Sequence, residues 1–352
     1  MNKVEQIYKP LLKWYNPDNK QMPWRKSSDP YKIWISEIML QQTQVSRVVE
    51  YYERWIRSFP SIKSVALASE TKILNHWAGL GYYNRAHNFH MACKILLKDF
   101  SGSFPNDIND FIALPGVGDY ISCAVFSIAF NTPVHVYDVN VNRLISRIMI
   151  LNTTQSSARS EAKKYLQKIV VASSSSGILN QAIMDYGRDI CTTKAPKCTK
   201  CLLSSNCKAY INNMVSSFPI IKKKNKRPHY RVVVGFVWNK AKVLINKRPK
   251  HKMLGGMWEF PGGKIKMKES PRSALKRELM EEFNINVKVH RPVDRFVYKY
   301  SHFSIDIEGY MCEYVSGDIK HEDNMPFKWI KPSNLYSLPF PSASEKFFNK
   351  LL

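Results

Sequence analysis

The sequence has no long apolar run. No stretch of its 352 residues approaches the ~18 consecutive apolar residues that a membrane-spanning helix requires. The N-terminal stretch MNKVEQIYKPLLKWYNPDNK contains neither a long apolar segment nor a small-residue cleavage site. We therefore expect no secretory signal and a cytoplasmic location.

Acidic residues are scarce. Asp and Glu number 28 against 53 Lys and Arg, which gives a net charge of +25 at pH 7. This surplus favours a polyanionic partner, for which DNA, RNA and an anionic membrane surface are the candidates. A lysine-rich surface produced by genome composition bias is the alternative that needs no partner. The 44% of hydrophobic residues allow packed cores, and at about 150 residues per domain the length favours two domains.

The cysteines do not suit a disulfide framework, because their number is odd and no secretory signal is expected. Cys93, Cys123 and Cys312 are scattered among apolar residues, and we expect them to act as small hydrophobic side chains. The other four form the pattern C-x6-C-x2-C-x5-C and are Cys191, Cys198, Cys201 and Cys207. Such a loop can hold a tetrahedral zinc ion or a [4Fe–4S] cluster, and the single CxxC with longer arms favours the cluster.

The chain divides into two parts of different texture. Apolar residues recur at helical spacing in segments 45–59, 86–100 and 121–130, so residues 1–212 are predicted to form an all-α domain. Residues 213–229 contain two prolines and a basic run, which is typical of an exposed linker. Residues 230–352 begin with β-branched and aromatic runs, so we expect a multidomain protein whose second domain is α+β.

Three features of the helical part suggest chemistry. The turn LPGVGDY at 114–120 leads into an apolar helix, and its glycines Gly116 and Gly118 suit a helix-hairpin-helix motif whose free N–H groups bind a phosphate. An ordinary structural turn is the alternative. Glu37 lies among apolar neighbours, where burial would raise its pKa and make it a proton donor. Asp138 precedes a helical run and is either a helix cap or a residue facing a cavity.

The helical part resembles a known family. The motifs that carry the resemblance are MPWR (22–25), PYKIWISEIMLQQTQV (30–45), WAGLGYYNRAHNF (77–89), LPGVGDYISCAVFSIAF (114–130), VYDVNVNR (136–143) and the cysteine loop (191–207). Together they are similar to the helix-hairpin-helix base-excision DNA glycosylases that carry a [4Fe–4S] cluster. The closest match is the adenine-DNA glycosylase (MutY) family, which the stretch QQTQV separates from the endonuclease III lyases.

The resemblance implies hydrolysis of the N-glycosidic bond of adenine mispaired with 8-oxoguanine or guanine, after the adenine has flipped out of double-stranded DNA. Glu37 would protonate adenine N7, and Asp138 would stabilise the cationic sugar or add to it covalently. Tyr120 and Asn140 match positions that support these two acids. Further matches, to positions around the flipped base, the strand and the emptied base stack, are Trp24, Arg25, Leu40, Tyr82 and Gln42.

One position bears on the type of enzyme. Lyases of this superfamily carry a Schiff-base Lys where this chain has Tyr120, so the resemblance implies a monofunctional glycosylase. Asn142 stands where the family often has Lys, which should reduce trapping on the abasic site. The resemblance further implies a monomer that is associated with the bacterial nucleoid and has no membrane partner.

The second domain carries another signature. Residues 263–285 match the Nudix box G-x5-E-x7-R-E-U-x-E-E-x-G-U, in which U is a bulky apolar residue, except that Asn284 replaces Gly. Asn is the next best residue for a left-handed helix end, so we expect the helix to end there. Glu278, Glu281 and Glu282 fall on one helix face and suit Mg²⁺, although a charged solvent face would have the same pattern. The segment resembles MutT.

The resemblance also assigns roles in this second domain. MutT-like domains of the family read 8-oxoguanine through a hairpin, and here Ser301 and His302 match its lesion-contacting positions. The family usually lacks an intact Nudix box, whereas this chain keeps one. A second hypothesis is therefore a Nudix pyrophosphohydrolase acting on nucleotides such as 8-oxo-dGTP, either as the main activity or beside the glycosylase. A DNA-binding protein without catalysis is disfavoured by the presence of both Glu37 and Asp138.

Overall fold

The computed structural model describes the chain except for residues 1, 17–21, 222–226, 250–251, 301–302 and 322. Contacts group it into two compact units, one of Met1–Leu67 with Asn88–Lys224 and one of Ala68–His87 with Asn225–Leu352. Segment 68–87, which the sequence places in the helical domain, belongs to the second unit because of bonds such as the one that His87 Nε2 makes with the Gly255 carbonyl at 2.8 Å. Most of the predicted basic run lies outside the described residues.

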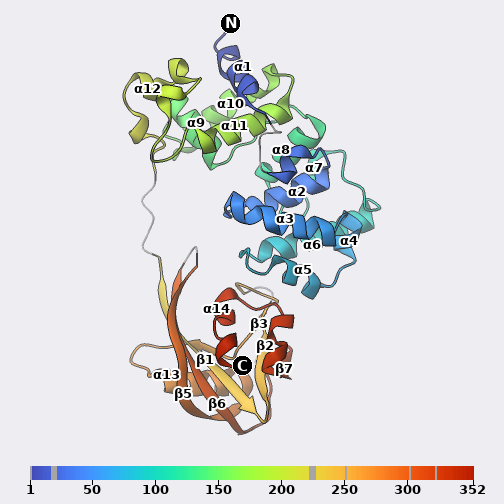
Figure 1. The fold of residues 1–352 in the computed structure, drawn as a ribbon, viewed down its shortest axis with the longest axis vertical. Helices are drawn as coiled ribbons and strands as arrows, with labels where there is room; N and C mark the ends of the chain where they lie inside the picture. Colours follow the sequence, from blue (N-terminus) through green and yellow to red (C-terminus); the bar gives the residue numbers. More distant parts are fainter. Residues whose placement is uncertain (1, 17–21, 222–226, 250–251, 301–302, 322) are drawn as a thin grey trace. The chain divides into compact units, whose positions relative to one another are not determined.

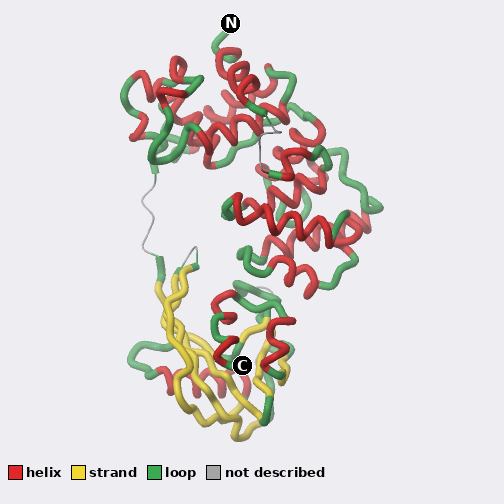
Figure 2. Tube along the Cα trace, viewed as in Figure 1, coloured by secondary structure: helices red, strands yellow, loops and turns green. Residues whose placement is uncertain are grey.

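The part of the chain before residue 213 is helical, as Figures 1 and 2 show. The predicted helices are confirmed as α3, α6 and α8. The helices are α1 (Glu5–Trp14), α2 (Pro30–Leu40), α3 (Val45–Ser58), α4 (Ile62–Ala66), α5 (Glu70–Trp77), α6 (Asn84–Asp99), α7 (Ile108–Ile112), α8 (Asp119–Phe130), α9 (Val139–Met149), α10 (Ser156–Ala172), α11 (Ser176–Asp189) and α12 (Lys208–Ile211). Short 3-10 helices are found at Pro23–Lys26, Cys198–Lys200, Ser204–Asn206 and Val215–Ser217.

Local signals set the ends of the helices that carry the site. Asp29 accepts a hydrogen bond from the Tyr31 N–H at the start of α2, where Pro30 fits the first helical position. Asn131 adopts a left-handed conformation and ends α8. Asp138 caps the first turn of α9, so the interpretation of this residue as a helix cap is confirmed. These ends hold three helices in register around one buried region.

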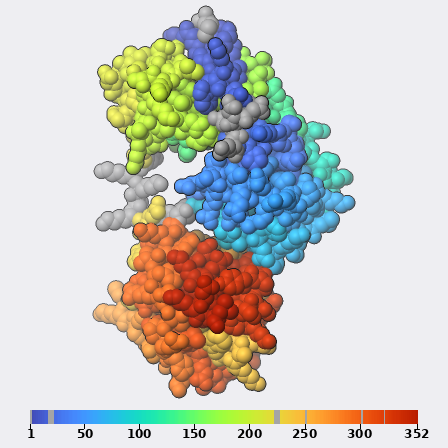
Figure 3. All heavy atoms as spheres, in the orientation of Figure 1, coloured from blue at the N-terminus to red at the C-terminus, as the bar shows by residue number. Residues whose placement is uncertain are grey.

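The core of the first unit is built by helices that pack against one another. Helix α2 packs on α8, and α8 packs on α11. Helix α1 buries Ile7 and Leu11 against α10 and α11, including Leu166 and Leu179. In Figure 3 the blue spheres of α1 lie next to yellow-green spheres, which belong to the last part of the first unit. Because α2 is buried on nearly every side, any charged residue in its middle lies in the protein interior.

The second part of the chain is built around a mixed sheet. Its strands are β1 (His229–Asn239), β2 (Lys242–Lys247), β3 (Trp258–Glu259), β4 (Gly262–Lys264), β5 (Ile285–Lys299), β6 (Ser304–Gly317) and β7 (Phe327–Ile330). The order is β3-β2-β1-β6-β5, with β4 also on β1 and β7 on β2. Strands β1 and β6 run parallel, whereas β5 and β6 form an antiparallel hairpin.

Helices cover the two faces of this sheet. Helix α13 (Pro271–Phe283) packs on one face, while α14 (Ser342–Glu345) and the short 3-10 helices Pro332–Ser337 and Phe348–Lys350 cover the other. The predicted combination of an all-α part and an α+β part is confirmed. Within the described residues, no helix has the length and apolar character needed to span a bilayer.

Candidate active site and cysteine centre

Glu37 lies at the centre of a buried polar cluster. It comes from the middle of α2 and is 1% exposed. The Tyr120 hydroxyl donates a hydrogen bond to Glu37 Oε2 at 2.6 Å, and Arg25 Nη1 lies 3.9 Å from Oε1. Burial raises the pKa of Glu37, and this outweighs the opposite effects of Arg25 and Tyr120. The direction of the pKa shift agrees with the expectation from the sequence, because burial favours the protonated carboxyl group.

Arg25 is held in place by α11, which the sequence-based prediction did not include. Its Nη2 lies 3.2 Å from Asp185 Oδ1, and its Nη1 lies 3.4 Å from Gln181 Oε1. Both Arg25 and Asp185 are almost fully buried, so Asp185 balances the charge of the guanidinium. Trp24 precedes Arg25 and is 2% exposed. The motif MPWR thus contributes the buried arginine that lies beside Glu37.

Asp138 faces the same cluster from the first turn of α9. Its Oδ1 accepts a hydrogen bond from the Val141 N–H at 2.6 Å, and its Oδ2 accepts one from Asn140 Nδ2 at 2.9 Å. Burial raises the pKa of Asp138, whereas these bonds lower it by stabilising the charged form. Its charge also raises the pKa of Glu37. The site therefore brings together two carboxyl groups, one hydrogen-bonded at a helix start and one buried beside an arginine.

A chain of hydrogen bonds leads from Asp138 to the cysteine loop. Asn140 Oδ1 accepts from Arg143 Nη2 at 2.9 Å, and Arg143 Nε donates to the Cys191 carbonyl at 2.6 Å. Arg143 Nη2 also donates to the carbonyl of Gly187 in α11. The sequence-based prediction missed Arg143, although its place one turn after Asn140 on α9 is a signal that could have found it.

The glycine turn before α8 has the expected geometry. Gly116 has φ +78°, and a Cβ atom there would lie 2.7 Å from Asn88 Cβ, so only glycine fits without strain. Gly118 precedes the helix with an ordinary φ of −119°, and a Cβ atom there would meet no described atom within 4 Å. Among the described residues, no side chain caps the first turn of α8. Its N–H groups are suited to a phosphate oxygen.

Other sequence-predicted residues occupy a helix end, a turn and the second unit. Leu40 ends α2, and the exposed Gln42 follows in a turn with φ +56°. Tyr82 has φ +51° and lies under the Arg85 guanidinium, but it belongs to the second unit. Ser301 and His302 lie outside the described residues. The hydrogen bond from the Tyr300 N–H to the Phe303 carbonyl, at 2.9 Å, flanks them.

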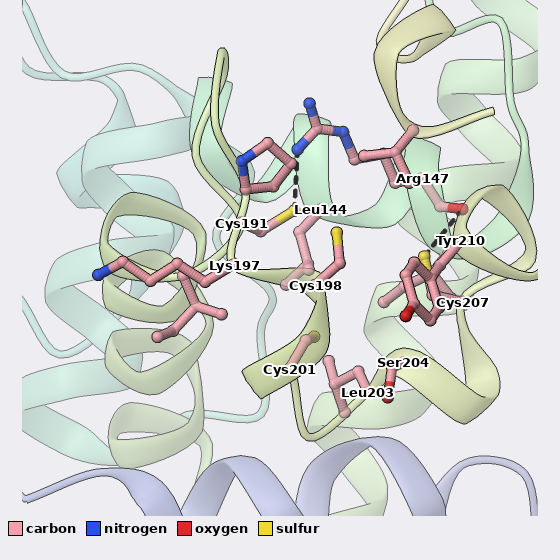
Figure 4. A pocket seen from close by; sticks show the side chains of 14 residues that line it. Leu144, Arg147, Cys191, Lys197, Cys198, Cys201, Leu203, Ser204, Cys207 and Tyr210 are labelled. Atoms are coloured by element: carbon pink, nitrogen blue, oxygen red, sulfur yellow. Dashed lines mark hydrogen bonds between the residues drawn. The ribbon is translucent and has the colours of Figure 1, made fainter. Parts of the chain in front are cut away.

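The four clustered cysteines line one pocket, as Figure 4 shows. Arg147 Nη1 donates to Cys191 Sγ at 3.3 Å, and the Tyr186 hydroxyl donates to Cys201 Sγ at 3.3 Å. Within the described part of the chain, no three His, Cys, Asp or Glu side chains have the closeness of a formed metal site. The donor set nevertheless fits a thiolate-bound centre, because four sulfurs face one pocket and two of them accept hydrogen bonds. Burial raises the pKa of Cys198 and Cys207, so a bound cation would favour the ionised form of these two thiols.

The Nudix-box glutamates border a second cavity. This cavity of about 630 Å³ is lined by Glu278 and Glu282, together with Glu259 and the aromatic rings of Phe260 and Tyr300. The helix ends at Asn284, whose φ of +54° and ψ of +40° confirm the predicted left-handed cap.

Arg277 forms ion pairs with three carboxylates of the box. It lies 2.8 Å from oxygens of Glu269, Glu278 and Glu281. The side chain of Glu281 is half exposed and does not line the cavity. Two of the three predicted magnesium ligands, Glu278 and Glu282, therefore line the cavity, and Arg277 binds both Glu278 and Glu281.

Comparisons with known proteins identify the family of this chain. Residues 35–170 match the HhH-GPD superfamily base excision DNA repair proteins, and residues 233–350 match the NUDIX domain. The chain is 32% identical to the adenine DNA glycosylase of Buchnera aphidicola subsp. Baizongia pistaciae over 98% of its own length and 96% of that protein. The chain belongs to the adenine DNA glycosylase family. Its likeness to the human adenine DNA glycosylase is 28% over 85% of this chain and 65% of that one.

Solved structures agree with this family. A thermostable thymine-DNA glycosylase is 27% identical, covers 60% of this chain and 97% of its own, and superposes with a TM-score of 0.53. A trapped covalent intermediate of endonuclease III with DNA covers 61% of this chain and 99% of its own at 22% identity, with a TM-score of 0.52. This second likeness shows the fold alone. The two family matches thus correspond to the helical part and to the Nudix-type part of this chain.

Proposed function

We propose that this adenine DNA glycosylase removes adenine paired with 8-oxoguanine or guanine in double-stranded DNA by hydrolysing the N-glycosidic bond. The observation that carries the proposal is the meeting of Glu37 and Asp138 in one buried cluster, with a raised pKa at Glu37. An adenine inside the duplex cannot reach a buried carboxyl group, so the base must leave the stack first. We further propose that the protein acts as a cytoplasmic, nucleoid-associated monomer.

The two carboxyl groups have different roles in the reaction. Glu37 gives its proton to adenine N7, the bond between C1′ and N9 breaks, and the base leaves with the bonding electron pair. Asp138, whose two hydrogen bonds favour its charged form, acts as the carboxylate that stabilises the positive charge developing on the sugar. Water then adds to C1′ and gives up one proton, and Glu37 takes up a proton again, so that the acid is restored. Tyr120 binds Oε2 of Glu37, which leaves Oε1 to hold the proton.

The same site supports a monofunctional reaction. Schiff-base lyases need an amine beside the sugar. Tyr120 stands at the lysine position of the related lyases, and its hydroxyl is bonded to Glu37. Strand cleavage should therefore require alkali added after the reaction.

The cysteine loop would hold a [4Fe–4S] cluster through Cys191, Cys198, Cys201 and Cys207. When bound, the cluster would supply a rigid crosslink for the loop and a redox-active group. The residues of the chain hold the loop against α9 and α11 through Arg143, Arg147 and Tyr186. Broad absorption near ~400 nm in the purified protein would identify the iron–sulfur centre, and a colourless, zinc-loaded protein would refute it.

The decisive test uses a strand-nicking assay on A:8-oxoG, A:G and C:8-oxoG duplexes, with and without alkali. The wild type should nick only the adenine-containing duplexes and only after alkali. Glu37→Gln and Asp138→Asn should each lose about 10²–10⁴-fold in rate, as expected when an acid or a charge-stabilising group is removed. Full activity in Asp138→Asn would contradict the assignment.

A second activity is favoured by one observation, the direction of Glu278 and Glu282 into a cavity of the Nudix-type domain. We propose that these glutamates bind Mg²⁺ and that the domain hydrolyses nucleoside triphosphates such as 8-oxo-dGTP to the monophosphate. The test incubates the intact protein with 8-oxo-dGTP and Mg²⁺. Glu282→Gln should abolish monophosphate release, whereas Glu313→Gln, at an exposed glutamate of β6, should not. No monophosphate from the wild type would show that the box is inactive.

A further inference from the structure

Arg147 is a buried arginine beside the cysteine pocket. It lies on α9 and is 2% exposed. Its guanidinium donates to Cys191 Sγ at 3.3 Å, to the Thr192 carbonyl at 2.8 Å and to the Thr193 carbonyl at 3.2 Å. Its Nε donates to the Phe218 carbonyl at 2.8 Å. One side chain therefore binds the first cysteine, the two residues after it, and the chain that leaves the helical part.

The backbone of the same residue reaches the last cysteine. The Cys207 thiol lies 3.5 Å from the Arg147 carbonyl. Figure 4 shows both contacts as dashed lines, one to Cys191 and one to Cys207. The Cys207 contact requires the protonated thiol, so only the side-chain bond of Arg147 to Cys191, at the start of the C-x6-C-x2-C-x5-C pattern, suits a cysteine that is bound as a thiolate. The inner cysteine Cys201 is held separately by Tyr186.

The chemistry of a guanidinium suits this position. Its planar fork presents five N–H donors in fixed directions and keeps its charge when buried. Four thiolates in one pocket carry a large negative charge, and a hydrogen-bonded cation at one sulfur stabilises that charge. A lysine would keep the charge, but its single ammonium group cannot reach a sulfur and three carbonyls from one place.

We propose that Arg147 is a positioning residue for the cluster, which fixes the outer ligand Cys191 and raises the reduction potential through its bond to Cys191. The inference rests on the proposed [4Fe–4S] centre. It makes two separate statements about this arginine. The geometry of the fork controls retention of the cluster, and the charge near the sulfur controls its potential.

The experiment uses the full-length protein and the variants Arg147→Met, Arg147→Lys and Arg159→Met. Arg159 is the matched control, because this exposed arginine also donates to a backbone carbonyl, that of Thr153, in the same helical part of the chain. Three quantities are measured: iron and sulfide per protein, the rate of visible absorbance loss in EDTA with ferricyanide, and the midpoint potential on an electrode. Circular dichroism confirms that each variant is folded.

Arg147→Met should lose absorbance at least tenfold faster than the wild type. Its midpoint potential should be lower, by ~59 mV for each tenfold loss of preference for the reduced state in a one-electron couple. Arg147→Lys should also lose the cluster faster, but its potential should stay close to that of the wild type. Arg159→Met should match the wild type in every measurement.

The outcomes distinguish a failure of the role of Arg147 from a failure of the iron–sulfur assignment. A wild type that contains zinc and no sulfide refutes the iron–sulfur assignment itself. A wild type with iron and sulfide, together with an Arg147→Met variant that keeps cluster and potential unchanged, overturns the role of Arg147 alone. If Arg147→Met does not fold, Arg147→Lys decides, and wild-type retention in that variant overturns the role of the fork.

Discussion

The hydrogen bond between Tyr120 and Glu37 sets the pH range in which the glycosylase has its acid. The tyrosine hydroxyl lies 2.6 Å from Glu37 Oε2 and lowers the pKa of Glu37 by stabilising its charged form. Burial and the neighbouring carboxylate raise the pKa of Tyr120, so its hydroxyl keeps the proton that it donates. Tyr120→Phe removes this bond and leaves the ring in place.

The size of the effect follows from the two states of Glu37. A hydrogen bond to a charged group is worth about 1.5–3 kcal/mol, against about 0.5–1.5 kcal/mol between neutral groups. The difference of about 1–1.5 kcal/mol corresponds to about one pKa unit. Because Glu37 must be protonated to act, the rate falls as the pH rises through its pKa. The variant has a higher pKa, so the alkaline limb of its pH–rate profile should move upward by about one pH unit.

The assay is single-turnover adenine release from an A:8-oxoG duplex between pH 5 and 10, with saturating enzyme. Tyr137→Phe is the matched control, since its hydroxyl binds Asn142 Oδ1 at 2.7 Å and is not bonded to Glu37. Its alkaline limb should stay at the wild-type position. An unchanged or lowered limb in Tyr120→Phe would refute the idea that this bond tunes the acid.

Three further predictions concern stability and binding. Gly116→Ala should lower the free energy of unfolding by about 1–3 kcal/mol, because it combines a left-handed φ with a 2.7 Å clash, whereas Gly118→Ala should change the melting temperature little. The pKa of Glu37 is raised in the folded protein, so the wild type loses stability as the pH rises from the unfolded pKa of about 4.3 through the folded pKa. Glu37→Gln does not titrate, so its stability relative to the wild type should increase over this pH range, and melting curves at pH 4 to 8 measure the difference. DNA affinity should fall steeply between 50 and 200 mM salt, with a slope of about −0.9 per phosphate neutralised in a binding titration, and a flat response would contradict backbone binding by the basic surplus.

The sequence alone determined the features that depend on a few neighbouring residues. The left-handed helix end at Asn284 and the cap at Asp138 each depend on one side chain and on backbone within four residues of it. Helical spacing likewise placed α3 and α8, because burying one face of a helix requires that period, and β-branched and aromatic composition placed β1. These signals are local, so they can be read without knowing what else packs nearby.

Only the tertiary structure decided which charges meet. Tyr120 and Glu37 are 83 residues apart, and Arg25 and Asp185 are 160 residues apart, yet each pair is in contact inside the protein. The same holds for Arg147, which binds Cys191 and Phe218 from α9. The energy of a buried charge depends on desolvation and on partners brought by distant elements. The spacing of residues along the chain gives neither the desolvation of a group nor its distant partners. The sequence therefore indicated Glu37 as an acid, whereas the fold brought Arg25 and Tyr120 next to it.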